Sequence, residues 1–328
     1  MPVESDAEGL GEGAGIVVDD GAWVLIEGTA ERRLGAALAW AVRRGATSLH
    51  VVADEGGGTV ARRSQGFALD IHVWFPEGRT LLPVLADDPV SSPAPNADHL
   101  ALTAMIEEAG AAAHVEFGVV TGEVRGLEVC RVVDEPTRGN FAELSDVVIE
   151  PPADLDDRLA EREHDGVILE VGVGANDREA FQLIHGHIPT PEALAGVVAA
   201  VAEHRQVASR QHPLNRMAPE RFVRWQVEQE PDRLGLTNLV AAEPPVRRQS
   251  MKHTEACVGL GTDTGGEPVV VVFSAGVDLD LMAFVADVRL SHTERMIVAM
   301  PERDLVSITR DLAEQLASPI ELVGLTAD

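Results

Sequence analysis

Two apolar, valine-rich stretches decide the fold expected of this chain: VEFGVVTGEVRGLEVCRVV at residues 115–133 and VILEVGVGANDREAFQLIHGH at residues 167–187. Both have the pattern of strands, yet they carry carboxylates such as Glu128 and Glu170, and the second also carries Arg178. A buried carboxylate is costly unless a metal ion, a proton or an arginine compensates it. The two stretches are therefore the first place to look for a functional site.

The segments on either side of these stretches repeat one order of strands and helices. The pattern on the amino-terminal side predicts strands at 23–27, 48–53 and 71–75, with helices at 30–44 and 59–67 between them. On the carboxyl-terminal side it predicts strands at 268–273, 296–300 and 320–325, with helices at 280–290 and 305–316. This β-α-β-α-β order is the half-unit of a doubly wound parallel sheet. The chain is therefore expected to be an α/β protein, with two Rossmann-like half-units flanking an α+β middle region.

The expected organisation has four parts. They are a disordered acidic tail (1–15), an amino-terminal Rossmann-like unit (16–90), an α+β middle domain (91–260) and a carboxyl-terminal Rossmann-like unit (261–328). Residues 238–268 are rich in turn formers and are expected to connect elements. Thr29 and Thr190 are expected to cap the helices that follow them.

Composition limits the functions that the chain can have. Its formal net charge of -28 predicts repulsion from bare nucleic acid and from anionic membranes, unless cations gather locally. Only one lysine, Lys252, is present, and no Gly-Lys-Ser/Thr sequence supports a P-loop. No apolar run reaches the ~20 residues of a membrane helix, and the start lacks the features of a signal peptide. The two cysteines, Cys130 and Cys257, form no disulfide framework, which fits a reducing compartment. Together these features favour a cytoplasmic protein without a membrane partner. They leave the oligomeric state open.

The middle region resembles the core of PD-(D/E)XK nucleases. In that family a helix with a glutamate precedes an acidic hairpin, a strand with Glu-x-Lys and a further helix. Here Glu128 lies in GLEV on the expected hairpin, Glu170 lies in LEVG on the next strand, and Asp177 opens a helix. The resemblance implies a restriction-endonuclease-like middle domain, but Gly172 stands where the family has its lysine.

This resemblance implies a catalytic centre. Glu128, Glu170 and Asp177 would bind Mg²⁺ or Mn²⁺ through oxygen ligands, and the ion would activate a water for attack on a phosphodiester. Arg178 would stabilise negative charge, although it cannot move protons as a lysine does. In the alternative, Glu128 and Glu170 lie on a solvated sheet face and pair with Arg125 and Arg131.

A second candidate site is an arginine face between residues 205 and 252. This window holds nine basic and five acidic residues in an otherwise acidic chain. Arg221 and Arg224 fall on one helical face beside Trp225, and arginine suits bidentate binding of phosphate. The window is therefore a candidate nucleotide or nucleic-acid face, with Arg221 and Arg224 as binding residues. The alternative is that these arginines pair with acidic parts of the same protein.

A third candidate is the stretch SAGVDLD at residues 274–280. It follows a strand and opens a helix, which is where parallel sheets bind ligands. Its Asp278 and Asp280 would repel a phosphate and are expected to cap the helix instead.

Two functions remain open. EVRGLEV, GVGANDREAF, HPLNR and GVDLDL resemble motifs of conserved proteins of high-GC actinobacteria, a family that implies no particular activity. The first function is that of a metal-dependent phosphodiesterase or nuclease-like protein with a degenerate site. The second is that of a non-catalytic scaffold or a small-molecule, nucleotide-sensing protein.

Overall fold

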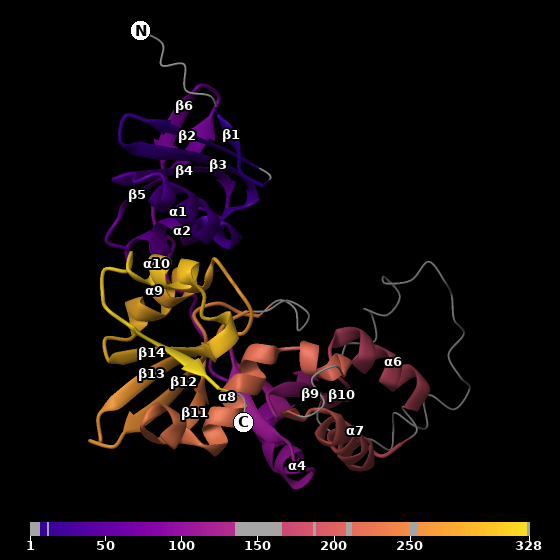
Figure 1. The fold of residues 1–328 in the computed structure, drawn as a ribbon. Coiled ribbons are helices and arrows are strands. Elements are labelled where there is room, and N and C mark those ends of the chain that lie inside the picture. Colours follow the sequence, from indigo (N-terminus) through magenta and orange to yellow (C-terminus); the bar gives the residue numbers. More distant parts are fainter. Residues whose placement is uncertain are drawn as a thin grey trace. The chain divides into compact units, whose positions relative to one another are not determined.

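A computed structural model describes residues 7–11, 13–134, 166–185, 188–207, 212–248 and 255–326. The chain forms two compact units (Figure 1). Unit 1 combines residues 1–91 with residues 217–328, and unit 2 comprises residues 92–216. The boundary expected at residue 260 therefore falls inside unit 1, because the segment after residue 217 supplies a helix and two strands to the carboxyl-terminal sheet.

The first sheet of unit 1 has six strands in the order β1-β2-β3-β4-β5-β6. They are β1 (Glu8–Gly9), β2 (Gly13–Val18), β3 (Gly21–Thr29), β4 (Ser48–Glu55), β5 (Asp70–Glu77) and β6 (Thr80–Pro83). β3, β4 and β5 are parallel and are connected by η1 (Ala30–Arg32), α1 (Leu34–Arg43) and α2 (Gly57–Ser64). β1, β2 and β6 pair antiparallel. Part of the expected disordered tail thus forms β1 and the start of β2.

The second sheet of unit 1 has five strands in the order β11-β12-β13-β14-β15. They are β11 (Leu236–Ala242), β12 (Cys257–Asp263), β13 (Pro268–Phe273), β14 (Arg295–Pro301) and β15 (Glu321–Leu325). β13, β14 and β15 are parallel, and α9 (Leu281–Ser291), η5 (Glu302–Asp304) and α10 (Ser307–Ala313) connect them. α8 (Pro219–Gln229) and η4 (Pro231–Leu234) precede β11. The α/β class is confirmed, and both sheets of unit 1 mix parallel with antiparallel strands.

One apolar core joins the two halves of unit 1. It contains Leu49 and Val51 from the first sheet, Val272 from the second, and residues of the helices between them, such as Leu38 and Val285. In Figure 1, α1 and α2 lie between the six-stranded sheet and the pair α9 and α10. A second core covers the other face of the five-stranded sheet, where the apolar side of α8 packs. Neither sheet can therefore bury its inner face without its partner half.

Unit 2 is built on an antiparallel sheet in the order β10-β9-β8-β7. Its strands are β7 (Ala112–Glu116), β8 (Val119–Val124), β9 (Leu127–Asp134) and β10 (Val167–Val171). Its helices are α3 (Ala97–Leu100), α4 (Thr103–Glu108), α6 (Ala175–His185), α7 (Thr190–His204) and η3 (Pro213–Arg216). Two-residue turns join the first three strands, at Phe117–Gly118 and Arg125–Gly126, and all four of these residues have positive φ. Positive φ at both positions is the signature of the type I′ hairpin turn.

Several local expectations were wrong. Residues 238–268, expected to be connecting, form most of β11 and β12; Gly259 and Gly261 lie within β12 because Leu239 packs over that face. Neither Thr29 nor Thr190 caps its helix with a side-chain hydrogen bond, because η1 intervenes after Thr29 and Pro189 takes the cap position before Thr190. The expected acidic loop at 135–165 lies outside the described residues.

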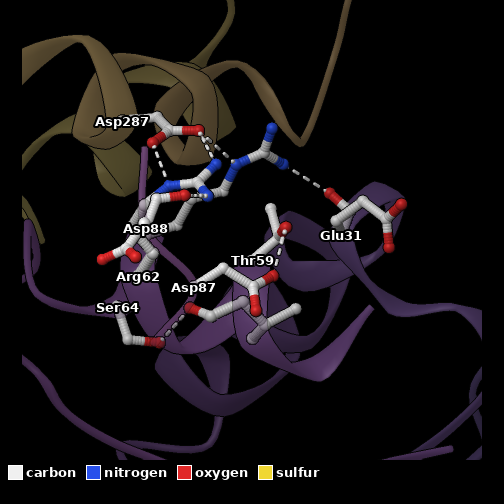
Figure 2. Close-up of polar contacts among 9 residues, drawn as sticks. Glu31, Thr59, Arg62, Ser64, Asp87, Asp88 and Asp287 are labelled. Carbon is white, nitrogen blue, oxygen red and sulfur yellow. Dashed lines mark hydrogen bonds and ion pairs between the residues drawn. The ribbon is translucent and has the colours of Figure 1, made fainter. Parts of the chain in front are cut away.

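A buried ion cluster ties α2 to α9 within unit 1 (Figure 2). The Asp287 carboxylate accepts from Nε and Nη2 of Arg62 at 2.8 and 2.9 Å, and from Nε of Arg63 at 3.2 Å. All three residues are at most 6% exposed. Arg62 also donates to the carbonyl of Asp88, and Arg63 donates to the carbonyl of Glu31. The two cations thus share one carboxylate and two backbone oxygens.

Replacing Asp287 by alanine is expected to destabilise the protein strongly. Asp287→Ala leaves two buried guanidinium groups without their carboxylate, and breaking a buried pair in this way costs about 3–5 kcal/mol. Chemical denaturation measures the loss. The matched control is Arg295→Ala, which removes an exposed ion pair with Glu321 and should cost no more than about 1 kcal/mol. Equal effects of the two substitutions would contradict the central role of Asp287.

Candidate functional site

The nuclease-like carboxylates of unit 2 meet around an arginine. Arg178 projects from α6, and its Nη1 lies 2.7 Å from Oε1 of Glu128 on β9. Its Nε lies 3.3 Å from Oε2 of Glu170 on β10. Arg131 holds Glu128 from the other side at 3.1 Å. Glu128 and Glu170 therefore converge, and the positive charge between them is a guanidinium that is 6% exposed.

Asp177 forms a hydrogen bond within its own loop. Its Oδ2 accepts the backbone N–H of Val173 at 2.6 Å, which closes the loop that leads into α6. Gly172, in the same loop, has a φ of 141°, and a Cβ there would come within 3.0 Å of the backbone of Arg178. A lysine at position 172 would therefore strain the loop. The three predicted ligands are not brought together as a set.

The alternative pairing holds for one arginine. Arg131 pairs with Glu128, whereas Arg125 donates to the carbonyl of Arg205, whose own Nε donates back to the carbonyl of Arg125. Within the described residues, no group of three or more His, Cys, Asp or Glu side chains is arranged to hold a metal ion. To bind a divalent ion, Glu128 and Glu170 would first have to release Arg178.

The expected arginine face is distributed rather than continuous. Arg205 is buried in unit 2, where it donates to backbone carbonyls. In unit 1, Arg224 is 1% exposed and lies 3.0 Å from Glu228, and Arg248 pairs with the fully buried Glu220. Arg221 lines a cavity in unit 1. Of the two predicted binding residues, Arg221 thus lines a candidate site, whereas Arg224 forms an ion pair with Glu228 on the same helix.

This cavity, called the arginine cavity below, has a volume of about 280 Å³. It lies where the loops after β3 and β13 meet α2, with α8 and the segments after β11 and before β12 alongside. Five arginines and four carboxylates line it, together with Thr59, Pro244, Val246, Ala256 and Phe284. The charged residues are Arg32, Arg63, Arg221, Arg247, Arg248, Glu31, Glu255, Asp278 and Asp280.

Arg63 is held in place before any ligand arrives. Asp287 fixes its Nε, and the carbonyl of Glu31 fixes its Nη1 at 2.7 Å. None of the described residues accepts a hydrogen bond from its Nη2. Since the side chain is buried and lines the cavity, its remaining donors are directed by packing and not by solvent.

Asp278 and Asp280 do not simply cap α9. Oδ1 of Asp278 accepts the N–H of Asp280 at 2.9 Å, as expected for a local cap, but Oδ1 of Asp280 accepts the N–H of Gly35 on α1 at 2.7 Å. A Cβ on Gly35 would lie 1.9 Å from the carbonyl oxygen of Leu279, so only glycine allows this approach. Burial raises the pKa of Asp278, and burial together with the nearby Asp278 raises the pKa of Asp280 to about 6.

Sequence patterns identified part of this cavity. The stretch 274–280 was marked by its place after a strand, and Arg221 by its helical face. Arg63, Glu31, Arg32 and Glu255 were missed, because nothing distinguishes these residues from surface charges until the two halves of unit 1 are assembled.

Comparison with known proteins gives no match to a family model, to a curated protein or to a solved structure. No helix in the part of the chain that the structure describes is long and apolar enough to cross a membrane. The candidate sites therefore rest on their own geometry.

The metal hypothesis has a direct test. Because Arg178 already pairs with Glu128 and Glu170, millimolar Mg²⁺ or Mn²⁺ is expected to leave the melting temperature of the wild-type protein unchanged. Thermal denaturation with and without each ion measures this. A metal-induced rise that Glu170→Ala abolishes would instead support the nuclease-like site.

Asp280 should make stability depend on pH. Its folded pKa of about 6 lies above the usual value of 3.8, so its ionised form is disfavoured in the folded protein. As pH rises from about 4 to above 6, Asp280 should therefore cost up to about 3 kcal/mol of stability. Asp280→Asn keeps an oxygen for Gly35 and removes this cost, so its melting temperature should exceed that of the wild type at pH 7.5 but not at pH 4. Asp311→Asn, on an exposed residue, is the control; a difference independent of pH would contradict the assignment.

Proposed function

We propose that the protein is a non-catalytic binding protein for a small phosphorylated ligand of the nucleotide class, held in the arginine cavity. The observation that carries this proposal is Arg63, a buried and pre-positioned guanidinium with donors left over in a cavity that four further arginines line. Donors fixed in advance lose little entropy when they bind, and arginine matches the geometry of a phosphate.

The charge of the whole chain favours a specific site over a general surface. A protein with a net charge of -28 repels polyanions over most of its surface. A phosphorylated small molecule that enters the cavity meets five arginines and four carboxylates, so the arginines can locally offset the acidic character of the chain. Two of the arginines that were expected to form a nucleic-acid face, Arg224 and Arg248, lie in buried ion pairs, so they are not displayed as a basic surface track for a polyanion.

The size of the cavity favours a mononucleotide. Its volume of about 280 Å³ is close to the lower end of typical ligand pockets, roughly 300–1,000 Å³. A dinucleotide or a nucleic-acid strand would extend well beyond it. Phe284 and Val246 add apolar surface on the cavity wall, which suits a ring or a ribose better than an inorganic ion.

Catalysis at Glu128, Glu170, Asp177 and Arg178 is less well supported. Arg178 and Arg131 together balance the charges of Glu128 and Glu170, and Asp177 accepts a hydrogen bond from Val173. A site whose carboxylates are already paired lacks the free negative charge that attracts Mg²⁺. A phosphodiesterase or nuclease activity stays a prediction, and the metal titration above tests it.

Binding of mononucleotides tests the proposal. Isothermal titration calorimetry with AMP, GMP, CMP and UMP is expected to give saturable binding of at least one of them. Arg247 is exposed, so Arg247→Ala should fold normally; because a charge-assisted hydrogen bond is lost, affinity should fall by roughly tenfold or more.

Arg303→Ala is the matched control, since Arg303 is an exposed arginine of unit 1 outside the cavity. It should bind as the wild type does. Absence of binding for all four nucleotides at millimolar concentration would refute the proposal, and so would an equal loss in Arg247→Ala and Arg303→Ala.

A further inference from the structure

The arginine cavity has a second chemical side, formed by the three carboxylates of Glu31, Asp278 and Asp280, which is called the carboxylate side below. Asp278 and Asp280 each use Oδ1 for a backbone N–H, and none of the described residues donates to their Oδ2 atoms. Oε2 of Glu31 is buried and has no hydrogen-bond partner among the described residues. The cavity therefore combines donors on Arg63 with acceptors that are still unsatisfied.

The carboxylates of Asp278 and Asp280 are half-buried, and their remaining oxygens can accept hydrogen bonds from a ligand. An acceptor that stays unpaired away from water is costly, so a ligand that satisfies it gains affinity beyond the contact alone. Burial raises the pKa of Asp278 and Asp280, so further negative charge beside them is unfavourable. A phosphate on the carboxylate side would add negative charge beside Asp278 and Asp280. The phosphate is therefore expected to lie at the arginines.

The donors on the ligand should be neutral. An ammonium group would be attracted by the carboxylates but repelled by the five arginines that line the same small space. Hydroxyl groups meet neither obstacle. Two adjacent carboxylates, each with one oxygen fixed by a backbone N–H and one remaining, match two neighbouring hydroxyl groups.

We infer that the carboxylate side binds the vicinal hydroxyls of a ribose, so that the cavity takes a ribose 5-phosphate group with its phosphate at the arginines. This inference rests on the proposed function and specifies its ligand. The group can come from a ribonucleotide or from a free sugar phosphate. Deoxyribonucleotides and inorganic phosphate present only part of it.

The strength of discrimination follows from the half-buried carboxylates of Asp278 and Asp280. A site built to hydrogen-bond a hydroxyl rejects the analogue that lacks it, because its polar groups are then left unpaired. Loss of one hydrogen bond to a charged acceptor corresponds to roughly 10- to 100-fold in affinity. The 2′-deoxy analogue should therefore bind at least about tenfold more weakly than its ribose counterpart.

Calorimetry at pH 7.5 tests the inference with ribonucleoside monophosphates, their 2′-deoxy counterparts, ribose 5-phosphate and inorganic phosphate. The expected result is a preference for each ribose form that binds over its deoxy form, with inorganic phosphate weakest. If ribose 5-phosphate binds as well as a nucleotide, the sugar phosphate is sufficient; if it binds more weakly, the base contributes. Both results keep the ribose assignment.

Asp278→Asn locates the effect. The amide keeps an acceptor for the N–H of Asp280 and weakens the acceptor on the cavity side, so the ribose-to-deoxy preference should fall towards one. Asp311→Asn, an exposed carboxylate outside the cavity, should keep the full preference. Circular dichroism checks that both variants fold.

The wild-type comparison stands even if Asp278→Asn does not fold. Equal binding of ribose and deoxyribose forms by the wild type would overturn the inference while leaving nucleotide binding intact. Absence of all binding would overturn the proposed function as well. A preference that persists unchanged in folded Asp278→Asn would show that the carboxylate side is not its source.

Discussion

The carboxylate of Asp287, buried between Arg62 and Arg63, is the constraint on which unit 1 depends. A buried ion cluster of this kind adds little net stability compared with apolar packing, but it tolerates very few arrangements. It fixes the angle and register at which α2 meets α9, and with them the meeting of the six-stranded and five-stranded sheets. Arg63 also lines the arginine cavity. The ion pair between Arg63 and Asp287 therefore both joins the two halves of unit 1 and positions a guanidinium for the candidate ligand.

Several energetically unfavourable features occur together in the arginine cavity. A carboxylate with a pKa of about 6, an unpaired buried oxygen on Glu31 and a close backbone approach at Gly35 all occur within it. In unit 2, the half-buried carboxylate of Glu128 has an arginine on α6 beside it. Perturbed carboxylates gathered in one cavity are a usual mark of a binding site.

Some of this organisation follows from local sequence, and some does not. Runs such as PVVVVF at 268–273 predict buried parallel strands because both faces of the strand are covered, and this was confirmed for β13. β12 was missed because Gly259 and Gly261, which read as turn residues, make room for neighbouring side chains inside the sheet. In unit 2 the sequence identified Glu128, Glu170 and Arg178 as one group but could not give the pairing, which depends on where α6 starts relative to β9. Arg63 could not be recognised, because its partner lies more than two hundred residues away.

The division of unit 1 into two separated segments has a consequence for synthesis on the ribosome. Unit 2 is continuous, so it can fold while the second segment of unit 1 is still being made. Arg62 and Asp287 are 225 residues apart, and at usual translation rates roughly 10–45 s pass between them. During that time the first sheet has no partner for its inner face, and two arginines stay without their carboxylate. The amino-terminal segment is thus a natural client for chaperones that hold exposed apolar surface until the carboxyl-terminal segment arrives.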